Sequence, residues 1–529
     1  MTRRDSSRNP VRFPLVLAAL AAAAALAAPA PAAEDAGLRA RVAKALAAPA
    51  LRSADAGVAV SRLGESDPLL SIAADRPLAP ASNMKVVTTA AALELLGRDY
   101  VFVTRFLARG EVARGSLAGD LVVVGGGDPG ISGRANGLGA ASRLEEAARA
   151  IRASGISRVE GRLVLDDRFF DRELVHPSWP KDQLGEWYCA EVSALSLNDN
   201  CLDVTVSGGA AAGAPAIVAI DPETAYVEVR NQAKTVAARA GHRFRIERKI
   251  GENRFAVTGG VLAKANGQVE SVTVHDPTLF FGAVFREALA RAGVAVAGET
   301  VVADRAAPFD PSAPPGAREI HRLETPLADA VEVCNKRSQN FYAEQIVKTI
   351  GRERKGEGSW RAGLGAIAEF LERLSCRRIG IEDAATPALK APGGEALPPG
   401  DFFLADGSGL SAANRISPRA LTRVLDHMLK TPARREFFDS LPIGGVDASL
   451  EKRLKDKKSI GRVVAKTGYI ARVSALSGYV RGEDGATYVF SILLNRFTGS
   501  NAEMKKIQDD VCRAIIEWSG SRANGRGSE

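Results

Sequence analysis

Short runs of β character occupy the middle of this chain and separate two segments with helical patterns. The β runs extend from about Ile217 to Val302 and are interrupted by one helical stretch near Thr278–Ala292. Ala306–Pro315, rich in Pro and Ala, is typical of a boundary, and helical spacing returns after it. Because 529 residues correspond to about three or four domain-sized units, the sequence predicts a multi-domain α/β chain.

Apolar periodicity predicts the individual elements. The expected helices are Leu38–Ala47, Ser82–Leu96, Ala141–Ala153, Pro326–Cys334, Ser338–Ile350, Ser359–Leu374, Ser417–Lys430 and Ala502–Trp518. The expected strands are Ala56–Arg62, its hairpin partner Leu69–Ala74, Val101–Arg109, Leu117–Val124, Val159–Asp166, Gly461–Lys466, Ala475–Arg481 and Thr487–Asn495. After Ser519 we expect a frayed tail rich in Gly, Ser and Arg.

Residues 1–33 have the composition of a removable export signal. Four arginines precede an apolar stretch from about Phe13 to Ala28, and Ala-Pro-Ala steps before Glu34 offer small-residue cleavage sites. The alternative is a retained anchor, but the apolar run is shorter than the ~20 residues of a spanning helix. No other stretch approaches that length, so we expect an exported, periplasmic protein with at most peripheral membrane contact.

The net charge of +8 is a small surplus for this length. Removal of residues 1–33 takes away four Arg and one Asp, which leaves about +5. We interpret this positive charge as spread along the chain, and it therefore does not indicate a nucleic-acid partner. Five cysteines are too few for a disulfide scaffold, and their odd number leaves at least one without a partner in the chain. Cys189 and Cys201 are near enough for a local disulfide, and the sequence leaves this pairing, and those of Cys334, Cys376 and Cys512, open.

Ser82-x-x-Lys85 begins an apolar helix, and its spacing predicts a hydroxyl and an ammonium on one helix face. A serine needs an adjacent base to act as a nucleophile, and a lysine with a lowered pKa can be that base. The helix N-terminus adds N–H groups where an oxyanion develops. The same spacing recurs at Ser178–Lys181, where Pro180 argues against a helix interior, and at Ser449–Lys452, in a charged stretch typical of a solvated surface.

Two further motifs offer polar groups to a cleft. Ser338-x-Asn340 lies at the start of a helix and can line a cleft if the chain turns there. Ser196-Leu197-Asn198 has the same pattern, and either can instead be a helix cap or turn. Lys466-Thr467-Gly468 occurs once, at the end of an apolar strand. The glycine permits close backbone approach by a ligand, and Lys and Thr offer donors to a carboxylate, the alternative being a strand-end turn.

In this order the three motifs resemble the serine acyl-transferase set of penicillin-binding proteins and β-lactamases. The surrounding sequences narrow the resemblance to the D-alanyl-D-alanine carboxypeptidase/endopeptidase family, the class C low-molecular-mass penicillin-binding proteins. They are PASNMKVVTTAAAL, GDLVVVGGGDP, WYCAEVSALSLNDN, NKRSQNFYAEQI, DGSGLS and LPIGGVDASLEKR before AKTG, within about residues 38–515. The 256 positions from Ser82 to Ser338 belong to the resemblance, since compact β-lactamases have no room for them.

The resemblance implies a cofactor-free serine peptidase that cleaves peptidoglycan stem peptides and is inhibited by β-lactams. It makes Ser82 the acylated nucleophile and Lys85 the general base. Ser338 would relay a proton to the leaving D-alanine. Asn340 would hydrogen-bond the substrate backbone and help to hold Lys85.

The Lys-Thr-Gly segment would hold the other end of the substrate. Lys466 and Thr467 would bind the terminal carboxylate beside Gly468, and the backbone N–H groups of Ser82 and Tyr469 would form the oxyanion hole. Tyr469 stands where small residues are usual, and we expect it to narrow the cleft without removing the backbone donor.

Two other positions depart from the family pattern. Ala412 follows DGSGLS where family members often carry Arg, so a substrate-carboxylate contact is in doubt unless Arg415 replaces it. Gln339 stands where Asp is common, which we expect to matter little.

The implied fold is a penicillin-binding/β-lactamase-like transpeptidase domain, an antiparallel sheet flanked by helices, interrupted by two nested β-rich domains. The expected division is a catalytic domain of residues 34–103 and 316–519, an inserted domain II of residues 104–131 and 222–315, a nested domain III of residues 132–221, and a flexible tail of residues 520–529. Ser196 and Asn198 then belong to the insertion, away from the catalytic set.

Several other patterns have simpler interpretations. Gly125, Gly127 and Gly130 match GxGxxG, but no helix is expected at Gly130, so a tight turn is favoured over a dinucleotide site. The five histidines are scattered without HExxH, so no metal site is expected. Lys452–Lys458 is interpreted as a solvated face. Asp182 is expected in a surface loop, the alternative being a contact to the amine of a peptide cross-link.

Two rival functions remain, together with an undetermined oligomeric state. A β-lactamase would use the same serine chemistry with fast deacylation, but the size and the insertion argue against it. A penicillin-binding cell-wall sensor or scaffold would have a degenerate site, and the intact motifs argue against that.

Overall fold

The computed structural model describes residues 35–525 except 66, 135–136, 307–308, 310–315 and 383–398. The predicted export signal and residues 526–529 of the predicted tail therefore lie outside the described residues. Within the described residues, no helix has both the length and the hydropathy to cross a membrane.

Strands from both ends of the chain build one antiparallel sheet, here the central sheet, in the order β2-β1-β22-β21-β20. Its strands are β1 (Asp55–Arg62), β2 (Pro68–Ile72), β20 (Val463–Ile470), β21 (Val473–Arg481) and β22 (Thr487–Asn495). The strand that ends the order, β20, carries the Lys-Thr-Gly motif. The predicted hairpin between β1 and β2 is confirmed, because Val58 pairs with Ile72.

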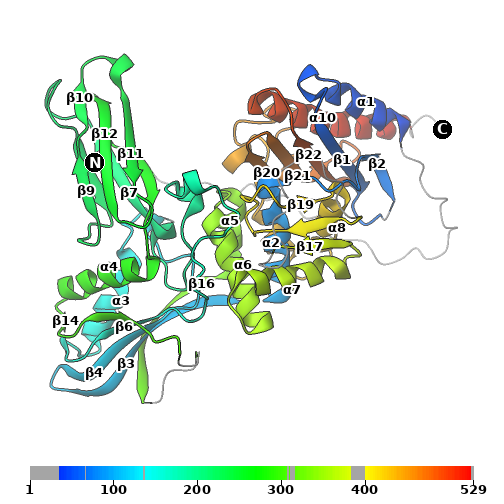
Figure 1. The fold of residues 1–529 in the computed structure, drawn as a ribbon. Coiled ribbons are helices and arrows are strands. Elements are labelled where there is room, and N and C mark those ends of the chain that lie inside the picture. The colour runs from blue at the N-terminus through cyan, green and yellow to red at the C-terminus, as the bar shows by residue number, and fades with distance from the viewer. Residues whose placement is uncertain are drawn as a thin grey trace.

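Helices cover both faces of the central sheet (Figure 1). One layer consists of α1 (Ala36–Leu46) and α10 (Asn501–Gly525), so the last helix continues beyond the predicted end at Trp518 and includes residues 520–525 of the predicted tail. The other layer contains α2 (Met84–Leu95), α5 (Leu327–Lys336), α6 (Asn340–Lys355), α7 (Trp360–Arg373), α8 (Pro418–Met428) and α9 (Arg434–Asp439). A small sheet of β17 (Arg378–Ile381), β18 (Phe402–Leu404) and β19 (Arg415–Ile416) lies beside them.

The residues between the two halves of the central sheet form further sheets. The largest is a mixed sheet of β3 (Val101–Ala113), β4 (Ser116–Val124), β5 (Arg158–Val159), β6 (Leu163–Asp166), β14 (Ala295–Val296), β15 (Thr300–Val302) and β16 (Ala317–Pro326). The helices α3 (Ser142–Ala153) and α4 (Pro277–Arg291) pack against it. The strand predicted for Val159–Asp166 is two strands, separated near Gly161, where a Cβ atom would lie 2.5 Å from Gly119 O.

Two smaller sheets complete the inserted part. One has the order β13-β7-β8, with β7 (Cys201–Ser207), β8 (Ile217–Asp221) and β13 (Gln268–Thr273). The other, here the tip sheet, contains β9 (Glu228–Asn231), β10 (Lys234–Val236), β11 (Arg243–Arg248) and β12 (Arg254–Leu262). Figure 1 shows the tip sheet at the upper left of the molecule, on the opposite side from α1 and α10.

Strand β16 lies on the catalytic side of the sequence boundary at residue 316, yet it pairs with β3 along its whole length. The sequence suggests only helical spacing after Pro315 and does not reveal β16. The strand is half-buried, and its sequence, AREIHRLETP, lacks a clear apolar run. The chain therefore passes from the insertion to α5 directly through Pro326.

All five cysteines are free and buried. The local disulfide between Cys189 and Cys201, which the sequence leaves open, is not formed. Burial raises the pKa of Cys189 to about 12 and that of Cys334 to about 11, so these thiols remain protonated and act as small apolar side chains.

Candidate active site

The turn before α2 places Ser82 and Lys85 together. Ser82 lies in the 3₁₀ helix η2 (Ala81–Asn83), and Lys85 in the first turn of α2. Lys85 Nζ donates to Ser82 Oγ at 3.1 Å, as the spacing of three predicts. Ala81 has a φ of +46°, which strains the backbone just before the serine. Strain at such a position is typical of residues that a functional site holds in place.

Lys85 is fully buried, and three acceptors surround its ammonium. Besides Ser82 Oγ, they are Asn340 Oδ1 at 2.6 Å and Ser408 O at 2.8 Å. Burial lowers the pKa of Lys85 from 10.5 to about 8. The amine is therefore partly neutral near pH 7 to 8, which a general base requires.

The second motif is brought to the same place from the insertion side of the chain. Ser338 has a φ of +56°, and this left-handed residue turns the chain between α5 and α6. Asn340, the first residue of α6, accepts from Lys85 and donates through Nδ2 to Tyr188 O at 2.8 Å. The turn on which this motif's prediction depends is thus present.

The third motif closes the site from the edge of the central sheet. Lys466 Nζ donates to Ser338 Oγ at 2.8 Å and to Thr467 O at 2.9 Å. Burial, with a smaller contribution from the positive charge of Lys85, lowers the pKa of Lys466 well below its ordinary value. Thr467 Oγ1 donates to Ser449 Oγ at 2.9 Å. Tyr469 is 54 % exposed at the rim.

Gly468 is where β20 touches the nucleophile turn. A Cβ atom at this position would lie 2.8 Å from Pro80 O, 3.0 Å from Ser82 N and 3.1 Å from Asn83 N, all backbone atoms. The Asn83 amide, in the orientation that satisfies both of its ends, donates to Lys466 O at 2.8 Å and accepts from Ser477. The segment that approaches this glycine closely is therefore the η2 backbone around Ser82, whereas the sequence suggested the approach of a ligand.

Gly468→Ala is expected to reduce acylation of Ser82 about 10- to 100-fold, because the added methyl must push η2 away from β20. Stopped-flow kinetics measure the acylation rate, and denaturant unfolding measures the stability of the variant. The free energy of unfolding should fall by no more than about 2 kcal/mol. Acylation of the Gly468→Ala variant at the wild-type rate would contradict the proposed contact.

A fourth segment, the 406–411 loop (DGSGLS), completes the lysine site. Its Ser408 O accepts from Lys85, and its Gly409, with a φ of +80°, passes so close to Ala81 O that a Cβ would lie 1.8 Å away. Glu344 of α6 holds this loop, since its carboxylate accepts from Ser408 N at 2.7 Å and Gly407 N at 3.1 Å.

Glu344 is fully buried, and Trp360 Nε1 also donates to it at 2.8 Å. Burial raises the pKa of Glu344 to about 7, and the nearby Asp406 adds to the rise. Asp406 is itself held by Gly409 N at 2.7 Å, Ser411 N at 2.6 Å and Trp179 Nε1 at 3.0 Å. The two carboxylates thus fix both ends of the loop that carries Ser408 O.

Glu344→Gln is expected to destabilise the protein by about 2–4 kcal/mol and to slow acylation about tenfold or more. One acceptor oxygen becomes an NH₂ group that faces N–H donors, so the loop must shift away from Lys85. Urea unfolding and acylation rates check this, with Glu353→Gln on the exposed side of the same helix as the matched control. If Glu344→Gln were as stable as Glu353→Gln, the role of Glu344 in holding the 406–411 loop would be contradicted.

The geometry bears on two positions that depart from the family pattern. Arg415 is buried and donates to Ala412 O at 2.6 Å and to Asn414 O at 2.8 Å, so it does not replace the arginine missing at position 412. Gln339 is not incidental, because its Nε2 donates to Asp199 Oδ2 at 2.8 Å. This bond joins the second motif to the insertion.

The other candidate patterns of the sequence lie away from the Ser82–Lys85 pair. Gly125, Gly127 and Gly130 form a turn after β4, and α3, the next α-helix among the described residues, begins at Ser142. Asp182 is exposed in a short 3₁₀ helix (Lys181–Gln183), where Gln183 Oε1 accepts from Tyr188 Oη at 3.0 Å. Asn198 bonds Ser132 and Cys201 inside the insertion, as expected.

Four contacts at the site are not evident from the sequence. They come from Ser408 O, Glu344, Tyr188 O and Ser449 Oγ. Two of them are backbone carbonyls, which no side-chain pattern reveals. Ser449 begins a Ser-x-x-Lys repeat in a stretch typical of a solvated surface, and it is exposed, but its hydroxyl touches Thr467.

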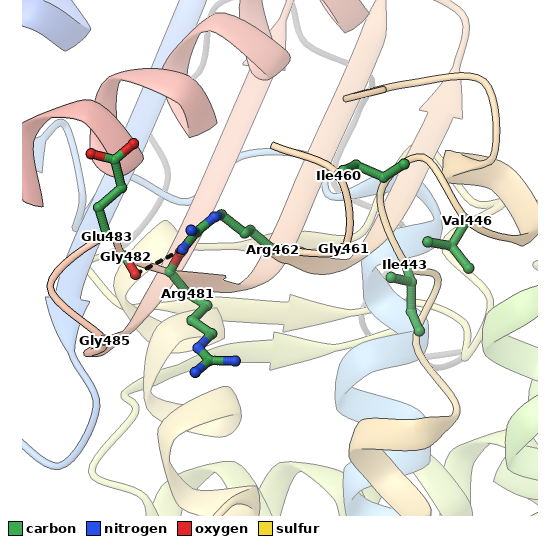
Figure 2. Close-up of a pocket in the computed structure, with 9 residues that line it drawn as sticks. All are labelled: Ile443, Val446, Ile460, Gly461, Arg462, Arg481, Gly482, Glu483 and Gly485. Carbon is green, nitrogen blue, oxygen red and sulfur yellow. Dashed lines mark hydrogen bonds between the residues drawn. The ribbon is translucent and has the colours of Figure 1, made fainter. Parts of the chain in front are cut away.

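A cavity of about 460 Å³ lies at the beginning of β20 and not at Ser82 (Figure 2). Ile443, Val446 and Ile460 line one side, and on the other Arg462 donates to Gly482 O at 3.0 Å. Its lining contains none of the predicted site residues. In the described part of the chain, no group of three or more His, Cys, Asp or Glu could hold a metal ion.

A helix-flanked antiparallel sheet with a half-buried Ser82 bonded to a fully buried Lys85 beside its edge strand defines a serine hydrolase of the penicillin-binding class. Residues 38–385 and 395–515 match the model of the D-Ala-D-Ala carboxypeptidase 3 (S13) family. The chain belongs to this family.

Individual relatives agree with this assignment. The chain is 34% identical over 460 residues to a D-alanyl-D-alanine carboxypeptidase of Actinomadura sp. (strain R39), covering 84% of this chain and 78% of the relative. It is 24% identical over 430 residues to D-alanyl-D-alanine carboxypeptidase DacB of Haemophilus influenzae, covering 80% and 82%.

Solved structures show the same fold. Penicillin binding protein 4 (dacB) from Haemophilus influenzae superposes with a TM-score of 0.72 at 20% identity, covering 90% of this chain and 99% of that one. Its complex with a β-lactam gives a TM-score of 0.68, also at 20% identity, with the same coverage. The α/β multi-domain fold expected from the sequence is confirmed.

Proposed function

We propose that this protein is a serine D-Ala-D-Ala carboxypeptidase and endopeptidase that acts on peptidoglycan stem peptides through an acyl-enzyme on Ser82. The observation that carries the proposal is Ser82 Oγ at 3.1 Å from the fully buried Nζ of Lys85, within a chain of the S13 family. A buried amine with a pKa of about 8 is a suitable base for a serine hydroxyl.

In the proposed acylation, Lys85 Nζ accepts the proton of Ser82 while Oγ bonds to the penultimate carbonyl carbon. The backbone N–H groups of Ser82 and Tyr469 hold the oxyanion, supported by the contact of Gly468 with the η2 backbone. The C–N bond to D-alanine then breaks, and Ser338 passes the proton to the leaving amine. Water hydrolyses the ester and restores Ser82.

Recognition of the terminal carboxylate is proposed for Lys466 and Thr467. In the free protein, burial and Lys85 disfavour the charge on Lys466. A bound carboxylate would favour that charge, so substrate and protonation would be coupled at this residue. Asn340, held between Lys85 and Tyr188 O, is placed to contact the peptide backbone.

β-Lactams would acylate the same serine, and residues 1–33 would direct the chain to the periplasm. We also propose the catalytic domain of residues 34–103 and 316–519, with residues 104–315 as the inserted domains. The central sheet, built from both chain ends, supports this division.

One experiment tests the function. The protein without residues 1–33 is incubated with a pentapeptide ending in D-Ala-D-Ala and, separately, with a fluorescent penicillin. Release of one D-alanine and a stable, stoichiometric penicillin adduct are expected. Rapid turnover of the penicillin would indicate a β-lactamase, and an adduct without D-alanine release would indicate a cell-wall sensor.

A further inference from the structure

The positive charge of the chain is concentrated in the tip sheet. Residues 228–264 contain three glutamates and nine basic residues, a net charge of +6 out of +8 for the whole chain. The basic residues are Arg230, Lys234, Arg239, Arg243, Arg245, Arg248, Lys249, Arg254 and Lys264. The net positive charge, which the composition suggested to be spread along the chain, is therefore concentrated in one segment.

Strand alternation collects much of this charge on one face. Phe255, Val257 and Val261 of β12 are buried, so Ala256 and Thr258 lie on the opposite, solvent-facing side. Across the strands, Arg245 of β11 pairs with Thr258 and Arg230 of β9 pairs with Ala256. Directly paired residues share a face, so the small residues of β12 lie between Arg230 and Lys234 on one side and Arg245 and Arg243 on the other. The same face also carries Glu247 opposite Ala256, and Glu228 opposite Arg254.

The register places a strip of small residues between longer side chains on the neighbouring strands, and this strip with its flanks is here called the basic channel. Its floor is Ala256 and Thr258, and its walls stand on the strands at each side, about 10 Å apart. Lys234 and Arg243 flank Gly260, where a Cβ atom would lie 2.2 Å from Gly241 O. The turn at residues 239–241 thus closes this end of the channel and adds Arg239.

The basic groups of the closed end are available to a ligand. Arg230 and Arg245 are each 64% exposed, although Arg230 forms an ion pair with Glu228 at 2.8 Å and Arg245 one with Glu247 at 4.0 Å. Within the described part of the chain, Lys234, Arg239 and Arg243 form no ion pair. They remain exposed, and uncompensated like charges on one face attract a polyanion.

We propose that the basic channel binds an extended, carboxylate-bearing strand of peptidoglycan; the proposal rests on the function proposed above. A floor of small residues with basic strands about 10 Å apart on its two sides accommodates a single extended chain, whose carboxylates would reach basic groups on both sides. The tip sheet is remote from the central sheet that carries the reaction (Figure 1). The channel would therefore hold the polymer while a neighbouring stem peptide reaches Ser82.

Co-sedimentation with purified peptidoglycan tests the proposal, using the protein without residues 1–33 at low and high salt. The test variant combines Lys234→Gln, Arg243→Gln and Arg245→Gln. Its matched control combines Arg149→Gln, Arg152→Gln and Arg354→Gln, which removes the same charge from other exposed helix positions. A second test variant, Thr258→Glu, places a negative charge on the channel floor without removing a basic group.

Both test variants should raise the dissociation constant about tenfold or more at low salt, and the control by less than twofold. Peptidoglycan whose carboxylates are converted to methylamides should bind the wild type as weakly as the test variants. Unchanged binding of both test variants overturns the inference, as does preferential binding to phosphatidylglycerol vesicles or DNA. D-Alanine release from a soluble pentapeptide should stay the same in every variant. Its absence in the wild type would contradict the proposed function and leave the binding result intact.

Discussion

Ser82→Ala is expected to abolish penicillin labelling and to lower D-alanine release by a factor of about 10⁴ or more. The hydroxyl supplies the only bond to the acyl group, and the alanine cannot replace it. The fold should hardly change, because Ser82 Oγ accepts a single bond from Lys85 and the turn is kept by backbone contacts with Gly468 and Gly409. Mass spectrometry of the penicillin adduct and a D-alanine assay measure both effects.

Ser449→Ala is the matched control for this prediction. Ser449 also begins a Ser-x-x-Lys sequence, and its hydroxyl lies 2.9 Å from Thr467 Oγ1, beside the site but without a lysine partner. It should keep full labelling and lose no more than about tenfold in D-alanine release, through a weaker carboxylate contact. If the label stays in Ser82→Ala and disappears in Ser449→Ala, the nucleophile is misassigned.

The site could be anticipated because its chemistry rests on short local spacings. Ser82 and Lys85 meet since three residues span one helical turn, and Ser338 faces Lys466 since a turn before α6 exposes its hydroxyl. The long gap between Ser82 and Ser338 also corresponds to a structural fact: the intervening residues build other sheets. The individual catalytic and binding roles and the exact domain boundaries stay predictions.

The remaining features depend on tertiary pairing, which periodicity does not encode. Lys85 is held by Ser408 O, a backbone atom whose position depends on Glu344, 64 residues away along the chain. Strand β16 is recognisable only beside β3, because its own residues are half-exposed. The basic channel arises because pairing with β12 puts Arg230 and Arg245 on the same face, on opposite sides of that strand, although neither is unusual in its local sequence.

The pH dependence of acylation is expected to report Lys85. Burial depresses its pKa to about 8, so the neutral base is about a tenth of the population at pH 7 and most of it at pH 9. The acylation rate should therefore rise about tenfold per unit below pH 7 and level off above pH 8. An ordinary lysine with a pKa of 10.5 would keep rising beyond pH 10.

Lys85→Arg is expected to lower the acylation rate by a factor of about 10³ or more and to remove the inflection near pH 8, because a guanidinium stays protonated in this range. Position 85 is fully buried, so the larger guanidinium of Lys85→Arg can also disturb the packing there. Lys85→Met removes the base without adding volume or charge, and its acylation should be equally slow. Lys348→Met is the matched control, because Lys348 is also fully buried but bonds Asp171 at 2.5 Å instead of Ser82. It should lose about 3 kcal/mol of stability and keep the inflection. If the inflection persists in Lys85→Met, another group supplies the base. The lowered pKa of Lys85 would then be a consequence of its burial without a catalytic role.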